Sequence, residues 1–236
     1  MRALAATDAN APDMRILTYN IRAGRDLDYA PALERQAAAI RALAPDVAAI
    51  QEVDRGARRS GGADQAAALA AATGLRASFA RSIDFEGGEY GIALLSREEP
   101  AAVRTVPLPS PHDEDRALLV ADFGAFVFAV THLSLHDGDR LASVDRILAE
   151  LLPSPRPVLL AGDWNALPES DTLRRIGSGF VLLSDPRAPT FPAGAPDRCI
   201  DYVAVDRDHA DAFRGAVARV VDEPSASDHR PVLVEA

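Results

Sequence analysis

Cysteine and long apolar runs are almost missing from this 236-residue sequence. The single cysteine, Cys199, excludes an internal disulfide and a zinc site built on several thiolates. Because Cys199 belongs to an apolar run, residues 199–203, we expect a small buried side chain there rather than a nucleophile. No run approaches the roughly 20 apolar residues that cross a bilayer, so no membrane-spanning segment is expected.

Positive charge is also in short supply. Acidic residues outnumber Lys and Arg by 35 to 25, and the formal net charge is -10. Proteins that hold duplex DNA without sequence preference neutralise its phosphates with a basic face. The composition therefore disfavours a nucleic-acid partner and favours a small molecule or a lipid head group.

The remaining composition is that of an ordinary folded protein, with 48% hydrophobic and 25% charged residues. The length suits one large core better than two domains. We expect residues 14–236 to form a single domain, and residues 1–13 to form a flexible extension before the first strand-like run. The protein is expected to be a cytoplasmic monomer.

Short apolar runs alternate with amphipathic ones along the chain. Periodicity and turn residues predict helices at 31–43, 64–73, 140–152 and 170–176. Strands are predicted at 14–19, 46–53, 91–96, 102–106, 117–123, 125–132, 157–161, 200–205, 216–221 and 231–234, with Gly124 in the turn of a hairpin. Many strands with few helices predict an α/β or α+β domain with packed sheets.

Polar residues interrupt the apolar runs at five strand ends. Strand ends of one sheet can converge on a single crevice, where rigid elements position short polar side chains. Asn, Glu, Asp and His without cysteine are hard, oxygen-rich ligands suited to Mg²⁺ or Mn²⁺. Phosphoryl transfer uses the same set, since it needs a cation, a group that holds water and donors for the developing charge. The interruptions are Asn20, Gln51-Glu52, Thr131-His132, Asp163-Trp164-Asn165 and Ser227-Asp228-His229.

Six short motifs, taken in order, resemble the endonuclease/exonuclease/phosphatase superfamily over residues 14 to 236. The resemblance implies a four-layered α/β sandwich, in which two mixed sheets pack face to face with helices outside. It also implies a catalytic domain that hydrolyses phosphate esters with Mg²⁺, for which Mn²⁺ could substitute. The motifs are Leu17-Thr18-Tyr19-Asn20-Ile21, Ile50-Gln51-Glu52, Thr131-His132-Leu133, Gly162-Asp163-Trp164-Asn165-Ala166, Ile200-Asp201-Tyr202 and Ser227-Asp228-His229-Arg230-Pro231.

The resemblance assigns three residues to the metal. Glu52 would be the principal ligand, and Asn20 beside it would hold metal or phosphate through its amide. Asp228 would be a ligand of the metal or of a metal-bound water. Asp228 is not expected to pair with the neighbouring His229, because adjacent residues of an extended segment point to opposite sides.

The resemblance assigns five residues to the reaction itself. Asp163 would orient and deprotonate the attacking water, and Asn165 would bind a non-bridging phosphate oxygen. His229 would donate to the phosphate, while Asp201 would fix the tautomer of His229 and raise its basicity. His132 would contact the phosphate from the opposite side.

Several further positions carry weaker signals. Arg116, after Asp115, resembles a family element and is a candidate for holding a substrate phosphate or a neighbouring acid. Ile92 stands where the family usually has an amide, which puts a substrate role for that strand in doubt. Cys199 replaces a basic residue that many relatives carry, with Arg198 one step earlier. The acidic run 113–115 is expected to be solvated, and Trp164 to be a packing aromatic that supports Asp163.

Each of these residues taken alone has a structural explanation, such as an Asx-turn at Asn20 or a solvated edge charge at Glu52. Independent turn formers have no reason to follow the family's order, so the joint catalytic interpretation is preferred. A DNA endonuclease of the same superfamily and a catalytically silent binding module are the alternatives. The loops at 84–90, 105–115 and 183–198, which are expected to set selectivity, contain no motif that names a substrate.

Overall fold

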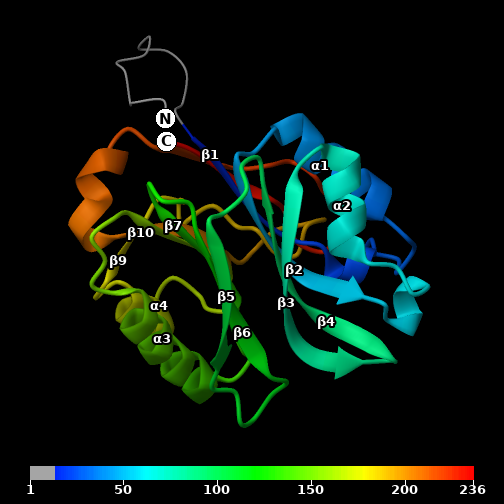
Figure 1. The fold of residues 1–236 in the computed structure, drawn as a ribbon, viewed down its shortest axis with the longest axis horizontal. Coiled ribbons are helices and arrows are strands. Elements are labelled where there is room, and N and C mark those ends of the chain that lie inside the picture. Colours follow the sequence, from blue (N-terminus) through cyan, green and yellow to red (C-terminus); the bar gives the residue numbers. More distant parts are fainter. Residues whose placement is uncertain (1–13) are drawn as a thin grey trace.

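The computed structural model describes residues 14–236 (Figure 1). The predicted N-terminal extension, residues 1–13, lies outside the described residues. None of the helices within 14–236 combines the length and apolar character that crossing a bilayer requires.

Two six-stranded sheets form the centre of the molecule. The first has the strand order β11-β12-β1-β2-β4-β3, and its only parallel pair within the described chain is β1 with β2. In that order the strands span Val217–Val220, Val232–Glu235, Arg15–Asn20, Val47–Arg55, Gly88–Ser96 and Arg76–Phe85.

The second sheet has the order β5-β6-β7-β8-β10-β9, and β7 pairs with β8 in parallel. Its other neighbours are antiparallel. The strands span Ala102–Leu108, Arg116–Asp122, Val127–His132, Val158–Asp163, Asp201–Asp206 and Phe180–Leu182.

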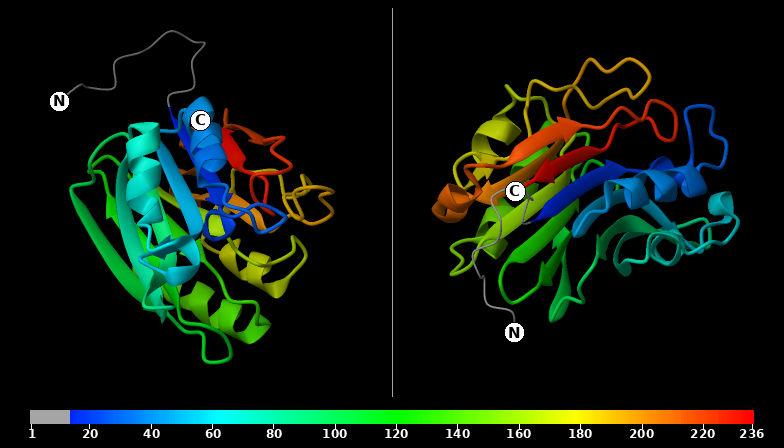
Figure 2. Two further views of the ribbon diagram at one scale, coloured as in Figure 1. Left: turned by 90° about the vertical axis from the view of Figure 1, so that its right-hand side faces the viewer. Right: turned by 90° about the horizontal axis from the view of Figure 1, so that it is seen from above.

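Helices cover the outer face of each sheet, so the molecule has four layers (Figure 2). Helices α1 (Leu33–Leu43) and α2 (Gln65–Thr73) lie on the first sheet, and α3 (Asp137–Leu151) and α4 (Asp171–Ile176) on the second. Short 3-10 helices span Arg22–Gly24, Arg58–Ser60 and Arg207–Phe213. The predicted four-layered sandwich of two mixed sheets is confirmed.

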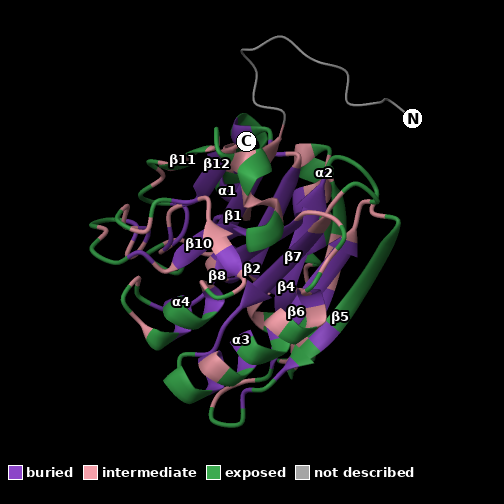
Figure 3. Ribbon diagram, turned by 90° about the vertical axis from the view of Figure 1, so that its left-hand side faces the viewer, coloured by how far each residue is buried: buried purple, intermediate pink, exposed green. Residues whose placement is uncertain are grey.

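Three apolar clusters separate these layers, because each strand sends alternate side chains to opposite faces. In β1, Ile16 faces the second sheet while Leu17 faces α1 and α2. In β8, Leu159 lies between the sheets while Leu160 packs under α3 and α4. Figure 3 shows the result, with buried strands in the middle and exposed outer faces on α3 and α4.

Two strand–helix–strand units occupy the middle of the sandwich. A parallel pair requires a crossover connection, which α1 supplies between β1 and β2, and α3 between β7 and β8. In both units the carboxyl ends of the strands carry polar residues, since Asn20 pairs in register with Gln51, and His132 with Asp163. The two sheets therefore present their polar strand ends to one edge of the sandwich.

Local signals in the sequence mark both ends of α2. Asp64 caps α2 by accepting a hydrogen bond from Ala67 N at 2.9 Å, and Gly74 ends it in the left-handed conformation. Strand β3 was not predicted, because its ten residues lie at a sheet edge with mostly exposed or half-buried side chains. Strand β9 has only three residues, and it was also missed.

Candidate active site

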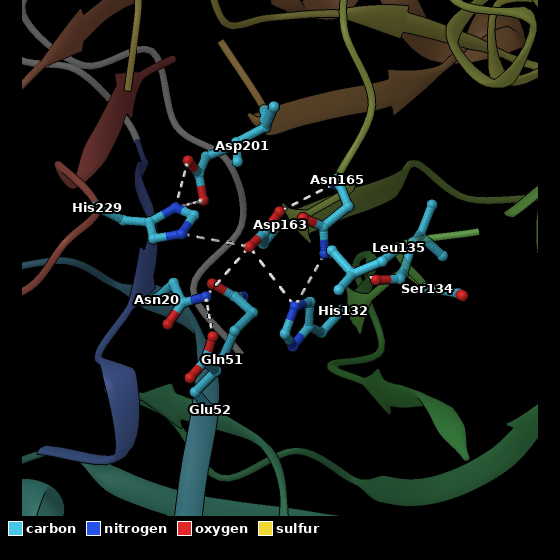
Figure 4. A network of polar contacts seen from close by, with 12 residues as sticks. Asn20, Gln51, Glu52, His132, Ser134, Leu135, Asp163, Asn165, Asp201 and His229 are labelled. Atoms are coloured by element: carbon cyan, nitrogen blue, oxygen red, sulfur yellow. Dashed lines mark hydrogen bonds and ion pairs between the residues drawn. The ribbon is translucent and has the colours of Figure 1, made fainter. Parts of the chain in front are cut away.

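The polar strand ends of both sheets meet in one crevice, shown in Figure 4. A cavity of about 430 Å³ opens there. Its walls include, from the first sheet and the segment before β12, Glu52, Asp228 and His229, and from the second sheet Arg116, His132, Asp163 and Asn165. Asn20 and Asp201 lie in the same network through hydrogen bonds to Asp163 and His229, respectively. The structure thus brings together all nine predicted site residues, and their individual roles stay predictions.

Two of these residues have a backbone conformation that ordinary side chains rarely adopt. Glu52 has φ of 57° at an irregularity in the β2–β4 register between Ile50 and Val53. Asn165 has φ of 47° directly after β8. Such conformations cost on the order of 1 kcal/mol or more and occur at sites where a side chain must be aimed. The bulge in β2 gives Glu52 an orientation that regular strand alternation does not.

Asp163 is the centre of the network. Its Oδ1 accepts a hydrogen bond from Asn165 N at 2.9 Å, and its Oδ2 accepts one from Asn20 Nδ2 at 3.1 Å. The Nε2 atoms of His132 and His229 lie 3.5 Å and 3.6 Å from the same Oδ2, from opposite sides. Burial raises the pKa of Asp163 to about 7, and the charge of Asp201 adds to it, against the opposing charge of His229.

His229 is held from behind by a second carboxylate. Its Nδ1 lies 3.1 Å and 2.9 Å from the two oxygens of Asp201, and Thr190 Oγ1 donates to Asp201 Oδ2 at 2.5 Å. Burial alone lowers the pKa of His229, but the charges of Asp201 and Asp163 outweigh it and raise the pKa to about 10. His229 is therefore an imidazolium at neutral pH.

His132 has the opposite environment. Its Nδ1 lies 3.1 Å from Arg116 Nη1, and its Nε2 lies 3.1 Å from Asn165 Nδ2. Burial, followed by the charge of Arg116 and then that of His229, holds the pKa of His132 well below its usual range. This histidine is neutral at physiological pH.

The acidic run before β6 is not solvated as the sequence suggested. Asp113 Oδ2 accepts hydrogen bonds from Arg116 Nη2, Ser134 Oγ and Leu135 N at 3.1, 3.0 and 2.9 Å. Glu114 Oε1 lies 2.9 Å from Arg116 Nη1. Asp113 and Glu114 are half-buried against the buried Arg116, and Asp115 alone is exposed. The sequence lacked a signal for this, because its three adjacent acids match an ordinary surface turn.

The residues predicted to bind the metal form a chain of oxygen and amide groups. Asn20 Nδ2 donates to Glu52 Oε1 at 2.9 Å, in addition to Asp163, while Asn20 Oδ1 accepts from Arg22 N at 3.0 Å. Asp228 Oδ2 lies 3.2 Å from Arg22 Nε. Asn20 therefore orients two carboxylates, and Glu52 and Asp228 supply the oxygen donors that hard cations such as Mg²⁺ prefer.

The charges of the cavity wall also fit a cation. Five carboxylates line it, namely those of Glu52, Asp113, Glu114, Asp163 and Asp228, against the two guanidinium groups of Arg116 and Arg198. Asp163, Asp201 and His229 bring ligand atoms within 4.8 Å of one another, which is a further geometry that can hold a metal ion. In that group Asp201 faces Nδ1 of His229 and Asp163 faces Nε2, so both carboxylates already lie against a charged ring.

Sequence patterns did not identify the aromatic wall of the cavity. Phe191 packs on His229 with ring centroids 4.8 Å apart, and the Arg198 guanidinium lies 4.8 Å from the Phe191 centroid. Tyr90 and Leu135 also line the cavity. An isolated apolar residue in a loop is normally a packing residue, so nothing in the pattern marked Phe191 or Leu135. Cys199 is buried and its thiol pKa is raised to about 12 by burial, as expected for a residue that is not a nucleophile.

Trp164 is fully buried, as predicted, and its ring packs 4.8 Å from that of Tyr202. Gly162, two residues before it in the chain, allows β7 and β8 to approach closely, because a side chain there would overlap the carbonyl oxygen of Thr131. These two contacts fix the turn that carries Asp163 and Asn165. The site is thus built on a rigid segment.

Two mixed sheets between helices, with carboxylates, amides and two histidines at one edge, define the class of phosphoesterases with an αββα sandwich. The Endonuclease/Exonuclease/phosphatase family matches residues 17–229, and the chain belongs to this family. Members of the family are phosphoesterase hydrolases that are typically metal-dependent.

Solved structures agree with this membership. The chain is similar to an endonuclease/exonuclease/phosphatase from Beutenbergia cavernae DSM 12333, with 25% identity, a TM-score of 0.73, and coverage of 94% of this chain and 70% of that one. It is also similar to a functionally unknown conserved protein from Enterococcus faecalis V583, with 23% identity, a TM-score of 0.75, and coverage of 94% of this chain and 98% of that one. A mannosyl-6-phosphatase from Bacteroides thetaiotaomicron VPI-5482 has 16% identity to the chain and a TM-score of 0.73, with coverage of 94% of this chain and 99% of that one. A search of curated proteins found no match.

Proposed function

We propose that the protein is a Mg²⁺-dependent hydrolase of phosphate esters that uses a water activated by Asp163. The observation that carries the proposal is the position of Asp163, a buried carboxylate between a protonated and a neutral histidine in the cavity. A carboxylate with its pKa raised toward neutrality is matched to accept a proton from water at physiological pH.

The chain's own residues divide the work as follows. Asp163 Oδ2 holds the attacking water and takes its proton as the water oxygen bonds to phosphorus. The ester P–O bond breaks, and the leaving oxygen keeps the electron pair and takes a proton from solvent. His229, charged and oriented by Asp201, donates from Nε2 to a phosphate oxygen as negative charge builds. Asn165 binds a non-bridging oxygen through its amide, and His132 contacts the phosphate from the other side.

Glu52 would hold the cation, with Asn20 beside it and Asp228 as a ligand of the metal or of its water. When bound, Mg²⁺ supplies positive charge to the phosphate oxygens in an otherwise acidic cavity. Without a cation the five lining carboxylates repel an anionic ester, which is the electrostatic reason for the metal requirement. Mn²⁺ should substitute because it accepts the same oxygen donors.

A small phosphate ester or a phosphorylated lipid head group is the proposed substrate class. The net charge of -10 is the reason for preferring it to nucleic acid. The structural similarity to a mannosyl-6-phosphatase makes sugar phosphates part of the substrates to be tried first.

The experiment is a screen of phosphomonoesters and phosphodiesters, including sugar phosphates, lipid head groups and oligonucleotides, with Mg²⁺, Mn²⁺ or Ca²⁺. Asp163→Asn serves as the blank. Metal-dependent release of product by the wild type, absent from the blank and abolished by EDTA, supports the proposal. Equal turnover by the variant removes Asp163 from its role, and indifference to EDTA contradicts the metal assignment. Absence of turnover across the whole panel favours a binding module, and preference for duplex DNA favours an endonuclease.

Glu52→Gln tests the metal side separately. The amide keeps the shape and the hydrogen-bonding reach toward Asn20 but loses the charge that attracts the cation. We expect the Mg²⁺ concentration for half-maximal activity to rise about 10-fold to 100-fold, with activity partly recovered at high Mg²⁺. An unchanged metal requirement would remove Glu52 from the metal site.

A further inference from the structure

Arg116 is a buried cation that the proposed reaction does not use. Only 5% of the residue is exposed, although it lines the cavity. Its Nη2 donates to Asp113, and its Nη1 lies 2.9 Å from Glu114 Oε1 and 3.1 Å from His132 Nδ1. The sequence predicted that this arginine holds a substrate phosphate or a neighbouring acid, and in the structure the guanidinium contacts two carboxylates and an imidazole.

The contact between Arg116 and His132 determines which ring nitrogen of His132 carries the proton. A guanidinium has only N–H donors and no acceptor. Where Arg116 Nη1 donates to Nδ1 of His132, this nitrogen must carry the lone pair. A neutral imidazole has one protonated nitrogen, so the proton belongs to Nε2.

The third neighbour of the ring is Asn165. Its Nδ2 lies 3.1 Å from His132 Nε2 and donates to Leu133 O at 2.9 Å. Two donors cannot both be accepted by an imidazole that keeps one N–H, so one of the two contacts gives way. Asn165 keeps its donation to Leu133 O, so its contact with Nε2 is the one that gives way, whereas the charged Arg116 can only donate to Nδ1. The arginine therefore decides the tautomer.

We propose that Arg116 is a positioning residue that holds His132 as the neutral Nε2–H tautomer, with this N–H directed toward Asp163 Oδ2 and the phosphate position. The proposal rests on the proposed function for its catalytic meaning, but the tautomer itself can be measured in the resting protein. It assigns Arg116 a role through His132 and not a direct grip on substrate.

The electrostatics around the ring agree with the geometry. Burial and the charges of Arg116 and His229 lower the pKa of His132, and only the negative charge of Asp113 opposes them. The charged or titratable groups near the ring come from four segments: Asp113 and Glu114 before β6, Arg116 at the start of β6, Asp163 at the end of β8, and His229 before β12.

A neutral Nε2–H donor has a consequence for the reaction. It offers a hydrogen bond to a phosphate oxygen without adding a second full charge beside Asp163, so Asp163 can still accept a proton near pH 7. The other tautomer would turn a lone pair toward Asp163 Oδ2, 3.5 Å away, and toward the phosphate, where both contacts are repulsive. Loss of the correct tautomer therefore removes a donor from the site.

The direct test is nitrogen-15 NMR of the histidine rings in the metal-free wild type at pH 7.5, with His132 assigned by a His132→Gln variant. The proposal predicts an unprotonated Nδ1 and a protonated Nε2. A protonated Nδ1, or an imidazolium, would overturn it. The measurement does not depend on finding a substrate, so its failure is distinct from failure of the proposed phosphoesterase activity.

Variants of Arg116 then test the cause. In Arg116→Met the ring should populate both tautomers, and the pKa of His132 should rise toward the ordinary ~6.5, because the neighbouring cation is gone. Arg116→Lys keeps a donor-only cation and should keep the Nε2–H form. Arg156→Met is the matched control, since Arg156 pairs with Asp122 at the far end of β6 and should leave His132 unchanged. If Arg116→Met does not fold, the tautomer of His132 in the wild type and in Arg116→Lys still tests the proposal.

Kinetics separate the two roles for Arg116. A positioning role predicts that Arg116→Met lowers kcat roughly tenfold with little change in KM, less than the loss of about 100-fold or more that follows removal of a direct oxyanion donor. Arg116→Lys should recover most of kcat. A phosphate-binding role predicts instead a raised KM with kcat retained, and that result, or an unaltered tautomer in Arg116→Met, contradicts the proposal.

Discussion

His132 and His229 flank the same carboxylate oxygen, since their Nε2 atoms lie 3.5 Å and 3.6 Å from Asp163 Oδ2. Both rings are buried, yet their charge states are opposite. Behind His229 lies Asp201, whose charge helps raise the pKa to about 10, and behind His132 lies Arg116, whose charge helps lower it. The difference between the two sides of the site is therefore set by the residue on the outer ring nitrogen.

This asymmetry suits a base placed between two donors. One imidazolium stabilises the ionised form of Asp163 and can donate to phosphate, while a second imidazolium would suppress the proton affinity that a base requires. A neutral ring on the other side supplies a hydrogen bond without that effect. The following predictions remove the shared carboxylate first, and then the partners that distinguish the two histidines.

The largest effect is expected from Asp163→Asn. The amide keeps the volume but cannot accept a proton from water, so kcat should fall by about 10³-fold or more. The melting temperature should stay close to that of the wild type or rise, because a buried charge is removed. Steady-state kinetics together with thermal unfolding check this, and a variant with near-normal kcat would show that the base lies elsewhere.

Asp201→Asn changes only the partner of His229 and should lower kcat by about 10-fold to 100-fold. The pKa of His229 should fall because its principal negative neighbour is gone. In ring-proton NMR, His229 should titrate at lower pH in the variant while His132 changes little. Equal pKa shifts in His229 and His132 would contradict the comparison, since they would mean that Asp201 acts on both histidines.

The pH profile of kcat should have an acidic limb set by Asp163 and an alkaline limb set by His229. Asp163 must be ionised to accept a proton, so activity rises as pH increases through its pKa of about 7. His229 must stay protonated, so activity falls as pH approaches its pKa of about 10. Asp201→Asn should move the alkaline limb to lower pH. An alkaline limb that stays in place in this variant would assign it to another group.

Thr190→Val should have the smallest effect. The threonine hydroxyl donates to Asp201 Oδ2 at 2.5 Å and thus touches the His229 side only through Asp201. We expect a loss of about 1–2 kcal/mol in the free energy of unfolding and a kcat change of only about threefold. Denaturant unfolding and kinetics test this, and Arg156→Met provides a surface control. A kcat loss as large as that of Asp201→Asn would show that Thr190 contacts the reaction directly.

The fold was largely predictable because its central strands have clear apolar runs. Residues 14–19 and 157–161 are buried on both faces and were predicted within one or two residues of β1 and β8. The edge strands β3 and β9 were not, since half-exposed edge residues lack the alternation that marks a strand. Helix α3 begins at Asp137 rather than 140, because its first turn is polar and shows no apolar periodicity.

The site was predictable where chemistry-bearing residues end buried strands, as Asn20 and Asp163 do. What could not be predicted is which side chain faces which. Asp113 and Glu114 resembled a solvated acidic run, and only the tertiary position of the buried Arg116 makes them its half-buried partners. Phe191 comes from a loop and reaches His229 through packing that leaves no periodic signal.

One pH titration of both histidine rings by NMR tests the account most directly. In the metal-free protein, His229 should remain protonated from pH 6 to above 9 and lose its proton near 10, while His132 stays neutral throughout that range. Two histidines that both titrate near their ordinary value of about 6.5 would contradict the account, because Asp163 would then lie between two equivalent rings.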